Sequence, residues 1–272
     1  GLPSDEFPVL PKIKEGRTFS IEPKVLASMI EQTIFSVSTS EEKYVLNGIL
    51  FEFGRSDIQG DNSNIRLIST DGYRLARRGE KISGDVKGNL KVIIPAKALA
   101  ELSRLLKEDG SAVVEILVSQ DQVAFKYKDT YLISRLIQGE FPDYKKVIPK
   151  GSEVKITADL GALLEASERT AVIASGSANI VKFEVKNNKL HLSANTPDVG
   201  SADEVLDVSV KGKPSTHIAF NIRLVTDALK AFDAEKVLIE LSGPLSPAII
   251  RPLDGPDYVY IVMPIRTSET VS

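Results

Sequence analysis

Cysteine is absent from this 272-residue sequence, and histidine occurs only twice, as His191 and His217. Without cysteine the chain has no disulfide bond, no thiolate nucleophile and no cysteine-ligated zinc site. Two histidines leave little scope for histidine-based acid–base catalysis. The sequence also has no glycine-rich phosphate loop and no cluster of metal ligands. We therefore expect a binding protein with no catalytic residues, no metal and no cofactor.

Long apolar runs are missing too, and none of the hydrophobic stretches is long enough to span a membrane. The first residues, Gly1–Asp5, contain neither a charged leader nor an apolar signal core. These features predict a cytoplasmic protein that does not bind membranes. Because the sequence does not begin with methionine, we expect a fragment or a product of tag cleavage.

An excess of positive charge is the third missing feature. The chain has 34 basic and 37 acidic residues, which gives a net charge of −3. A general nucleic-acid binder is expected to be basic overall. If this protein meets DNA, its cations must therefore gather on one surface.

What the sequence does contain is typical of a globular protein with sizeable cores, since 42% of the residues are hydrophobic and 26% are charged. The length suggests about two domains. Helices are predicted to begin at Pro23 and Pro95, to run from Asp159 to about Arg169, and to cover Ile222–Phe232 with Asn221 as N-cap.

Strands are predicted wherever short apolar runs alternate or stand between turn signals. In the first half they are Thr18–Glu22, Tyr44–Phe53, Ile65–Ser69, Arg74–Lys81, Lys91–Ile94, Val113–Val118, Gln122–Tyr127 and Thr130–Ile137. In the second half they are Val154–Thr157, Ile180–Val185, Lys189–Ala194, Thr216–Phe220, Lys236–Ser242, Ala248–Pro252 and Tyr258–Ile265. The turn signal Thr70–Tyr73 predicts a hairpin between two of the strands.

The two halves repeat the same order of elements. Four pairs of segments match in order, namely Phe35–Ser38 with Val172–Ser175, Phe51–Phe53 with Phe183–Val185, Ile94–Lys97 with Phe220–Arg223, and Tyr131 with Tyr258. Together they indicate a duplication. We therefore predict an α+β fold of two tandem copies of one repeat, each with two helices packed on antiparallel sheet. The proline-containing linker divides the chain into 1–144 and 145–272.

The second helix of each copy carries a similar charged triplet. The triplets are Lys97, Glu101 and Arg104 in the first copy and Arg223, Asp227 and Lys230 in the second. One interpretation is a ladder of i,i+4 salt bridges on a solvated face. The other is a row of cations that follows a phosphate backbone without reading bases. The sequence leaves both open.

An ordered set of short motifs gives the chain a family resemblance. The motifs are Leu46–Gly48, Ser69–Ala76, Gly139–Tyr144 and Val262–Arg266. In order and context they resemble the bacterial DNA sliding clamp, the β subunit of the replicative DNA polymerase III, and the resemblance covers essentially the whole chain. Clamp protomers have three repeats, and the sequence resembles the second and third.

The resemblance implies a processivity factor without enzymatic activity. In this family two protomers join head to tail into a homodimeric ring around duplex DNA. Polymerase subunits, the clamp loader and repair proteins insert short peptides into a pocket between the second and third repeats. Because the first repeat is missing from the 272 residues, we expect this chain to be monomeric, to bind DNA weakly and to retain peptide binding.

The resemblance also implies where the sites lie. The peptide pocket would comprise Leu46, Thr70, Gly72, Tyr73, Arg74, Leu75, Pro142, Lys146, Val147, Leu245, Pro247, Ile261, Met263, Pro264, Ile265 and Arg266. Residues facing DNA would be Tyr44, Lys97, Arg104, Arg223 and Lys230, and Val172 and Ile173 would pack on the partner protomer. The cations Arg74, Lys146 and Arg266 would orient polar groups or carboxylates of a peptide.

Alternative readings accompany these assignments. Leu46, Leu75 and Ile261 lie in strand patterns and would be core residues in most proteins. A hydrolase or transferase would have to use Asp71 with Arg74 or Asp143 with Tyr144, and no nucleophile, base and orienting group are placed together. A scaffold module unrelated to DNA is the other alternative. The chain departs from the family at Lys146, where arginine is common, and in the tail Thr267–Ser272.

Overall fold

The computed structural model describes residues 15–58, 61–82, 88–107, 112–197, 199–213 and 215–267. In the first copy the strands are β1 (Arg17–Ile21), β2 (Gly48–Phe53), β3 (Ile65–Thr70), β4 (Arg74–Glu80), β5 (Leu90–Pro95), β6 (Val114–Val118), β7 (Gln122–Tyr127) and β8 (Thr130–Arg135). Its helices are α1 (Pro23–Ile34), α2 (Ala96–Leu106) and the 3₁₀ helix η2 (Glu41–Leu46). None of the helices described is both long and apolar enough to cross a membrane.

The second copy repeats this order after the 3₁₀ helix η3 (Tyr144–Val147) in the linker. Its strands are β9 (Val154–Asp159), β10 (Ile180–Lys186), β11 (Lys189–Thr196), β12 (Gly200–Asp207), β13 (Ser209–Gly212), β14 (Ser215–Asn221), β15 (Lys236–Leu241), β16 (Ala248–Pro252) and β17 (Tyr258–Val262). Its helices are α3 (Leu160–Ala174) and α4 (Ile222–Ala231). The predicted α+β fold with two copies is confirmed.

Local sequence accounts for the helix starts. Pro23 opens α1 at a position where its missing N–H costs nothing. The side chain of Asp159 accepts a hydrogen bond from the backbone N–H of Ala162 at the start of α3. Asn221, predicted as the N-cap of α4, accepts one from the N–H of Arg223.

Several predicted boundaries are wrong, each for a local reason. The strand expected at Tyr44–Phe53 begins only at Gly48, because Glu41–Leu46 turns into η2 and buries Leu46. The last strand ends at Val262 rather than Ile265, since Pro264 has no N–H to continue a ladder.

Two strands and the last turn of one helix were not predicted. Helix α3 continues past Arg169 to Ala174, because Thr170 and Ala174 extend its buried face. Strands β12 and β13 escaped detection because charged residues interrupt the apolar alternation of β12 and β13 is only four residues long.

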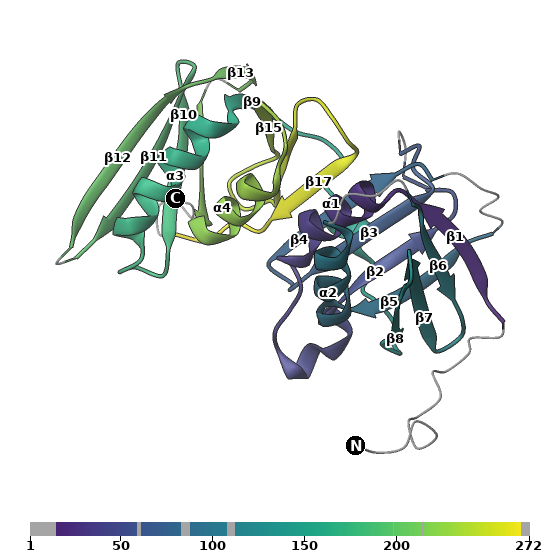
Figure 1. The fold of residues 1–272 in the computed structure, drawn as a ribbon. Coiled ribbons are helices and arrows are strands. Elements are labelled where there is room, and N and C mark those ends of the chain that lie inside the picture. The colour runs from purple at the N-terminus through teal and green to yellow at the C-terminus, as the bar shows by residue number, and fades with distance from the viewer. Residues whose placement is uncertain are drawn as a thin grey trace.

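A single nine-stranded antiparallel sheet joins the two copies, in the order β13-β9-β15-β16-β17-β4-β3-β2-β5. The copies meet where β17 pairs with β4, with Tyr258 opposite Arg78 and Val262 opposite Arg74 (Figure 1). Two four-stranded sheets, β1-β6-β7-β8 and β12-β11-β10-β14, lie at either end. The last strand of the chain is therefore part of the first copy's sheet as well as its own.

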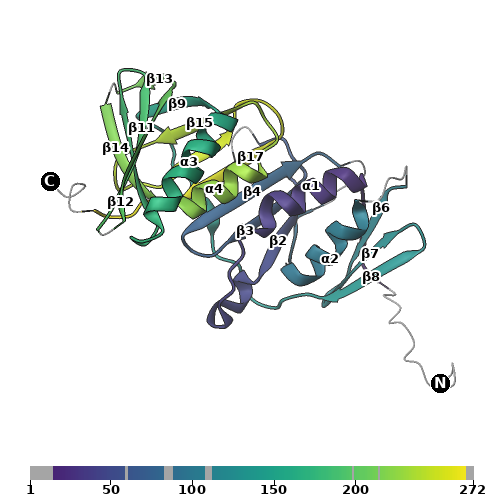
Figure 2. The ribbon, with the colours of Figure 1, turned by 60° about the vertical axis from the view of Figure 1, so that its left-hand side comes forward.

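The four α-helices follow one another along one side of the molecule, in the order α3, α4, α1, α2 (Figure 2). The outer faces of α2 and α4, which carry the charged triplets, therefore contribute to the same surface. Helix α1 of the first copy contacts α4 of the second, so helices as well as strands join the copies.

Each copy has its own hydrophobic core beneath its helices, and a third cluster lies at the junction on the opposite face of the sheet. Strand β2 contributes to both faces, because successive side chains of a strand point to opposite sides of the sheet. Ile49, Phe51 and Phe53 face the first core, whereas Leu50 faces the third cluster. The third cluster combines Leu50, Ile68, Leu75, Ile93, Tyr144 and Ile261, which come from both copies and the linker.

A buried ion network fixes the register of β17 on β4. Arg77 of β4 donates to Asp61 at 2.7 Å and to both carboxylate oxygens of Asp257 at 2.7 and 2.8 Å. Burial raises the pKa of Asp61, but hydrogen bonds from Ser56 and Ser63 and the charge of Arg77 outweigh it and lower this pKa to about 2. Asp257 behaves oppositely, because burial and the nearby charge of Asp61 raise its pKa in spite of Arg77.

The low pKa of Asp61 predicts acid lability. Its folded pKa of about 2 lies below the pKa of about 3.9 of an aspartate in an unfolded chain, so its charged form stabilises the fold above about pH 4. That contribution, about 2 kcal/mol, is lost as the pH falls towards 2. The comparison is made in an Asp257→Asn parent, because removing Asp61 alone would also lower the pKa of Asp257 and offset the effect. In that parent, Asp61→Asn should shrink the stability difference between pH 7 and pH 3 by about 1 kcal/mol.

Urea unfolding of this parent and of its Asp61→Asn variant at both pH values measures this difference. Asp121→Asn, which changes an exposed carboxylate, serves as the matched control and should leave the pH dependence as it is. An unchanged pH dependence in Asp61→Asn would contradict the assignment of acid lability to this network.

Candidate functional site

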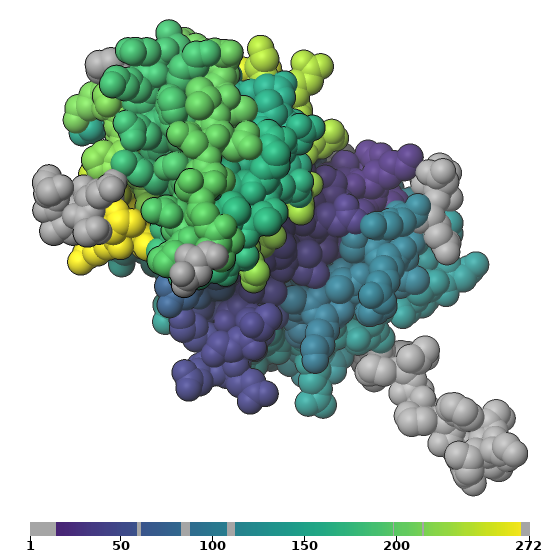
Figure 3. All heavy atoms as spheres, turned by 90° about the vertical axis from the view of Figure 1, so that its left-hand side faces the viewer, coloured from purple at the N-terminus to yellow at the C-terminus, as the bar shows by residue number. Residues whose placement is uncertain are grey.

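An apolar cavity of about 150 Å³ lies where the two copies and the linker meet, and we call it the junction cavity. It is lined by Leu46, Thr70, Gly72, Tyr73, Arg74, Leu75, Pro142, Asp143, Tyr144, Val147, Ile261 and Met263. In Figure 3 the second copy, in green and yellow, rests directly on the first copy, in purple and blue. The cavity therefore depends on both copies for its walls.

The β3–β4 turn forms the first wall and is held by its own side chains. The hydroxyl of Thr70 accepts from the N–H of Gly72 and donates to the carbonyl of Arg74 at 2.6 Å. Asp71 accepts from the N–H groups of Tyr73 and Arg74. Gly72 has a φ of 97°, which a side chain would disfavour. The turn is thus preorganised, and Tyr73 projects from it with 67% of its surface exposed.

The linker forms the second wall and is fixed by Tyr144. Its ring is buried in the third cluster, and its hydroxyl donates to Glu52 of β2 at 2.8 Å. Glu52 also forms an ion pair with Lys91 at 2.7 Å and accepts from Arg66 at 3.3 Å. Burial raises the pKa of Glu52, but these three partners outweigh it and lower the value. Burial and the charge of Glu52 raise the pKa of Tyr144, which keeps the phenol protonated as a donor.

The end of β17 forms the third wall. Ile261 pairs with Leu75 across the junction, and the N–H of Met263 donates to the carbonyl of Tyr73 at 2.9 Å. The side chain of Met263 is 40% exposed at the cavity. Beyond it the chain turns towards the second copy, because the N–H of Ile265 donates to Ala219 of β14.

The structure brings ten of the predicted pocket residues together around the junction cavity. These are Leu46, Thr70, Gly72, Tyr73, Arg74, Leu75, Pro142, Val147, Ile261 and Met263. The other six do not line it: Lys146, Leu245, Pro247, Pro264, Ile265 and Arg266. Lys146 is exposed and forms an ion pair with Asp143 at 3.3 Å. Thr267 lies in a groove over β10, β11 and β12, and the remaining tail residues are outside the described part.

Two residues that line the cavity were not assigned to it from the sequence. Asp143 and Tyr144 lie within the Gly139–Tyr144 motif, so the signal was present, but they were considered only as linker residues and as an alternative catalytic pair. Its partner Glu52 is 92 positions away in the sequence. Sequence spacing alone does not reveal such a pairing.

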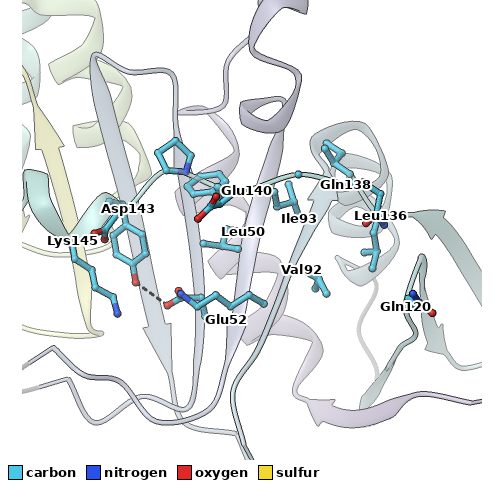
Figure 4. A pocket seen from close by; sticks show the side chains of 16 residues that line it. Leu50, Glu52, Val92, Ile93, Gln120, Leu136, Gln138, Glu140, Asp143 and Lys145 are labelled. Atoms are coloured by element: carbon cyan, nitrogen blue, oxygen red, sulfur yellow. Dashed lines mark hydrogen bonds and ion pairs between the residues drawn. The ribbon is translucent and has the colours of Figure 1, made fainter.

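A larger and more polar cavity, of about 500 Å³, lies behind the linker between β2, β5 and residues 136–145 (Figure 4). The dashed line in Figure 4 marks the hydrogen bond between Tyr144 and Glu52. Pro142, Asp143 and Tyr144 border both cavities. The linker is therefore a thin partition, and its position depends on Glu52.

The residues predicted to face DNA are exposed in the structure. Tyr44 in η2 is 57% exposed, and the cations of α2 and α4 point away from the cores. For the first triplet the salt-bridge interpretation is confirmed in part, as a single i,i+3 pair between Arg104 and Glu101 at 3.0 Å. It is wrong for the second triplet, because Asp227 pairs with Arg74 of the first copy at 2.6 Å and Lys230 with Glu168 of α3 at 2.8 Å.

Val172 and Ile173, predicted at a protomer interface, differ in burial. Val172 is 70% exposed near the end of α3, whereas Ile173 packs partly against the second core. The corresponding segment of the first copy begins at Phe35, which packs against Tyr260 of the second copy with ring centroids 5.9 Å apart. Val172 therefore occupies the position equivalent to Phe35, and Phe35 makes a contact between the two copies.

The pairs considered for catalysis have structural roles. Asp71 bonds the turn and forms an ion pair with Arg74 at 2.9 Å, while Asp143 pairs with Lys146. In the ranges that the structure covers, no three His, Asp or Glu side chains gather as a metal site would require.

Two family models match the chain. The model of the DNA polymerase III beta subunit central domain matches residues 20–143, and that of its C-terminal domain matches residues 145–266. Among curated proteins, the beta sliding clamp of Staphylococcus aureus is 34% identical over 268 residues, covering 98% of this chain and 69% of the relative. The beta sliding clamp of Bacillus subtilis is 32% identical over 269 residues, with the same coverage.

The solved structures that resemble this chain are also bacterial DNA polymerase sliding clamps. The DNA polymerase sliding clamp from Bacillus subtilis superimposes with a TM-score of 0.89 at 31% identity and covers 98% of this chain and 68% of that protein. The DNA polymerase III beta subunit from Thermotoga maritima superimposes with a TM-score of 0.88 at 31% identity, covering 98% and 70%.

Proposed function

The chain belongs to the family of bacterial DNA polymerase III β subunits, the β sliding clamps, and on that premise we propose that it binds short peptides of partner proteins in the junction cavity. The observation that carries the proposal is the cavity itself. Apolar side chains from both copies and the linker meet there, and Tyr73, Val147 and Met263 remain exposed around it. The proposed role is binding without catalysis.

The size and lining of the cavity suit a peptide better than a small metabolite. Pockets for drug-sized molecules occupy about 300 to 1,000 Å³, whereas the junction cavity has about 150 Å³. That space suits one or two apolar side chains of an extended segment. Polymerase subunits, the clamp loader and repair proteins are the proposed sources of such segments.

We further infer that these two repeats take part in a homodimeric ring around duplex DNA only together with a further copy of the repeat, and that the 272 residues alone are monomeric. At the junction between copies, the last strand of the second copy, β17, pairs with the fourth strand of the first copy, β4. The equivalent strands, β8 and β12, lie at the ends of the two outer sheets. They are placed to repeat this junction with further copies of the repeat, while α2 and α4 present their cations on one surface.

We place the division between the copies at 1–144 and 145–272. Tyr144 belongs with the first copy, since its ring packs in the cluster with Leu75 and its hydroxyl bonds Glu52. Strand β9, which starts at Val154, is the first strand of the second copy.

The proposal predicts that Met263→Ala weakens peptide binding at least about fivefold, because truncating one of the few residues that dominate an interface costs about 1 kcal/mol or more. A labelled short peptide with two apolar anchors and one polar residue is titrated against the chain by fluorescence anisotropy. Leu253→Ala is the matched control, since Leu253 is equally exposed at 40% but lies in the β16–β17 connection. No binding by the parent chain, or equal binding by Met263→Ala, would refute the proposal.

A further inference from the structure

Arg74 reaches from the junction cavity to the second copy, and its guanidinium is held there by two carboxylates. Its Nε donates to Asp71 at 2.9 Å and its Nη1 donates to Asp227 of α4 at 2.6 Å. Both contacts are charge-assisted hydrogen bonds of ordinary length. Asp71 lies in the same turn as Arg74, whereas Asp227 is 153 positions further along the chain.

The surroundings reinforce this position. The guanidinium carbon lies 5.5 Å from the ring centre of Phe35, and the Arg74 side chain is only 12% exposed. Burial opposes the charge of Arg74, but the hydrogen bond to Asp227 and the charges of Asp71 and Asp227 outweigh it and raise the pKa of Arg74. The hydroxyl of Tyr260, beside the same group, donates to Leu224 of α4 at 2.6 Å. The arginine is therefore fixed in one place by α1, α4 and β17.

The charges around this arginine decide what it offers to a ligand. One cation faces two anions, so the group carries a local net charge of −1. Its charged end is directed towards Asp227, which borders a separate cleft between α1 and α4 together with Phe35 and Lys230. The junction cavity is therefore bordered by a guanidinium whose positive charge is outweighed by two carboxylates. An acidic peptide would gain little electrostatic binding energy from this group.

We propose that Asp227 is a specificity-determining residue, which holds the Arg74 guanidinium and so makes the junction cavity prefer neutral over acidic peptide segments. This rests on the proposed function, because it concerns the ligand of the same cavity. Asp227 is a positioning residue that acts through Arg74 and lies on α4 of the second copy. It reverses the expectation from the sequence that Arg74 orients carboxylates of a peptide.

The test measures a ratio of affinities. A series of short peptides keeps the same apolar anchors and carries either glutamate or glutamine at each flanking position in turn. Parent chain, Asp227→Asn and Asp227→Ala are titrated with every pair. The 43% exposure of the Asp227 side chain lets both variants fold, and thermal unfolding checks that they do.

In the parent we expect each glutamate peptide to bind no more tightly than its glutamine twin. In both variants the glutamate-to-glutamine ratio should shift about three- to tenfold towards glutamate at the position nearest Arg74. The shift should diminish at high salt. Asp233→Asn is the control, because it removes an equal charge just after α4 in the same cleft.

The outcomes separate the two proposals. If the parent binds the glutamine peptides but neither variant shifts the ratio relative to Asp233→Asn, the role of Asp227 is refuted and the peptide cavity stands. A parent that already prefers glutamate refutes the inference too. If the parent binds none of the peptides, the proposed function fails and the inference fails with it.

Discussion

Replacing Arg77 with alanine is expected to lower the free energy of unfolding by about 3 to 5 kcal/mol, because it leaves the buried carboxylate of Asp61 without its main cationic partner. The side chains of Arg77 and Asp61 are 4% and 1% exposed. Of the two cations beside it, Asp61 would keep only Arg66, at 3.8 Å, and Asp257 would lose both of its hydrogen bonds to the guanidinium. The loss should fall on the junction, since Asp257 immediately precedes β17.

Urea unfolding measures the loss, and Arg104→Ala is the control. Arg104 also forms an ion pair with a carboxylate, Glu101, but its side chain is 75% exposed. Exposed pairs of this kind contribute about 0 to 1 kcal/mol. If the Arg77 variant lost no more than the Arg104 variant, the network would not be what holds the two copies together.

The sequence predicts the elements of this fold well where burial follows a simple period. Helices with one apolar face and strands between turn signals were located because these patterns depend on neighbouring residues only. The prediction failed at Tyr44–Phe53, where apolar residues continue through a short 3₁₀ helix into a strand. It also missed β12, whose exposed charges are tolerated because it lies at the end of its sheet.

The candidate site was predicted best where its residues are consecutive. The turn around Gly72 and the end of β17 appear as short motifs, and both line the junction cavity. Short sequence motifs do not reveal contacts between segments that are distant in the chain. The Asp227 triplet read as a helix surface, yet Asp227 bonds Arg74 in the other copy. Only the three-dimensional structure shows that the charged triplet of α4 and the turn motif around Arg74 are joined by an ion pair.

A second large effect is expected for Glu52→Ala, which should lower stability by about 3 kcal/mol or more and also weaken peptide binding. Glu52 is 4% exposed and balances Arg66, which is 3% exposed, so its loss leaves a buried cation with only the more distant carboxylate of Asp61, at 3.8 Å. The same change removes the acceptor of the Tyr144 hydroxyl. The linker that forms one wall of the junction cavity would then lose its attachment, and peptide affinity should fall several-fold.

Glu240→Ala separates the two effects, because Glu240 in β15 also pairs with two cations, Lys155 at 2.9 Å and Arg251 at 3.0 Å, but does not line the junction cavity. Its partners are partly exposed, so a smaller loss of stability is expected and peptide affinity should not change. Affinity is measured at a temperature where circular dichroism shows each variant folded. Were the Glu52 variant destabilised but unchanged in peptide affinity, the carboxylate would support the first copy without positioning the linker. A fall in both quantities, with only stability affected in Glu240→Ala, would tie the buried carboxylate to the shape of the cavity.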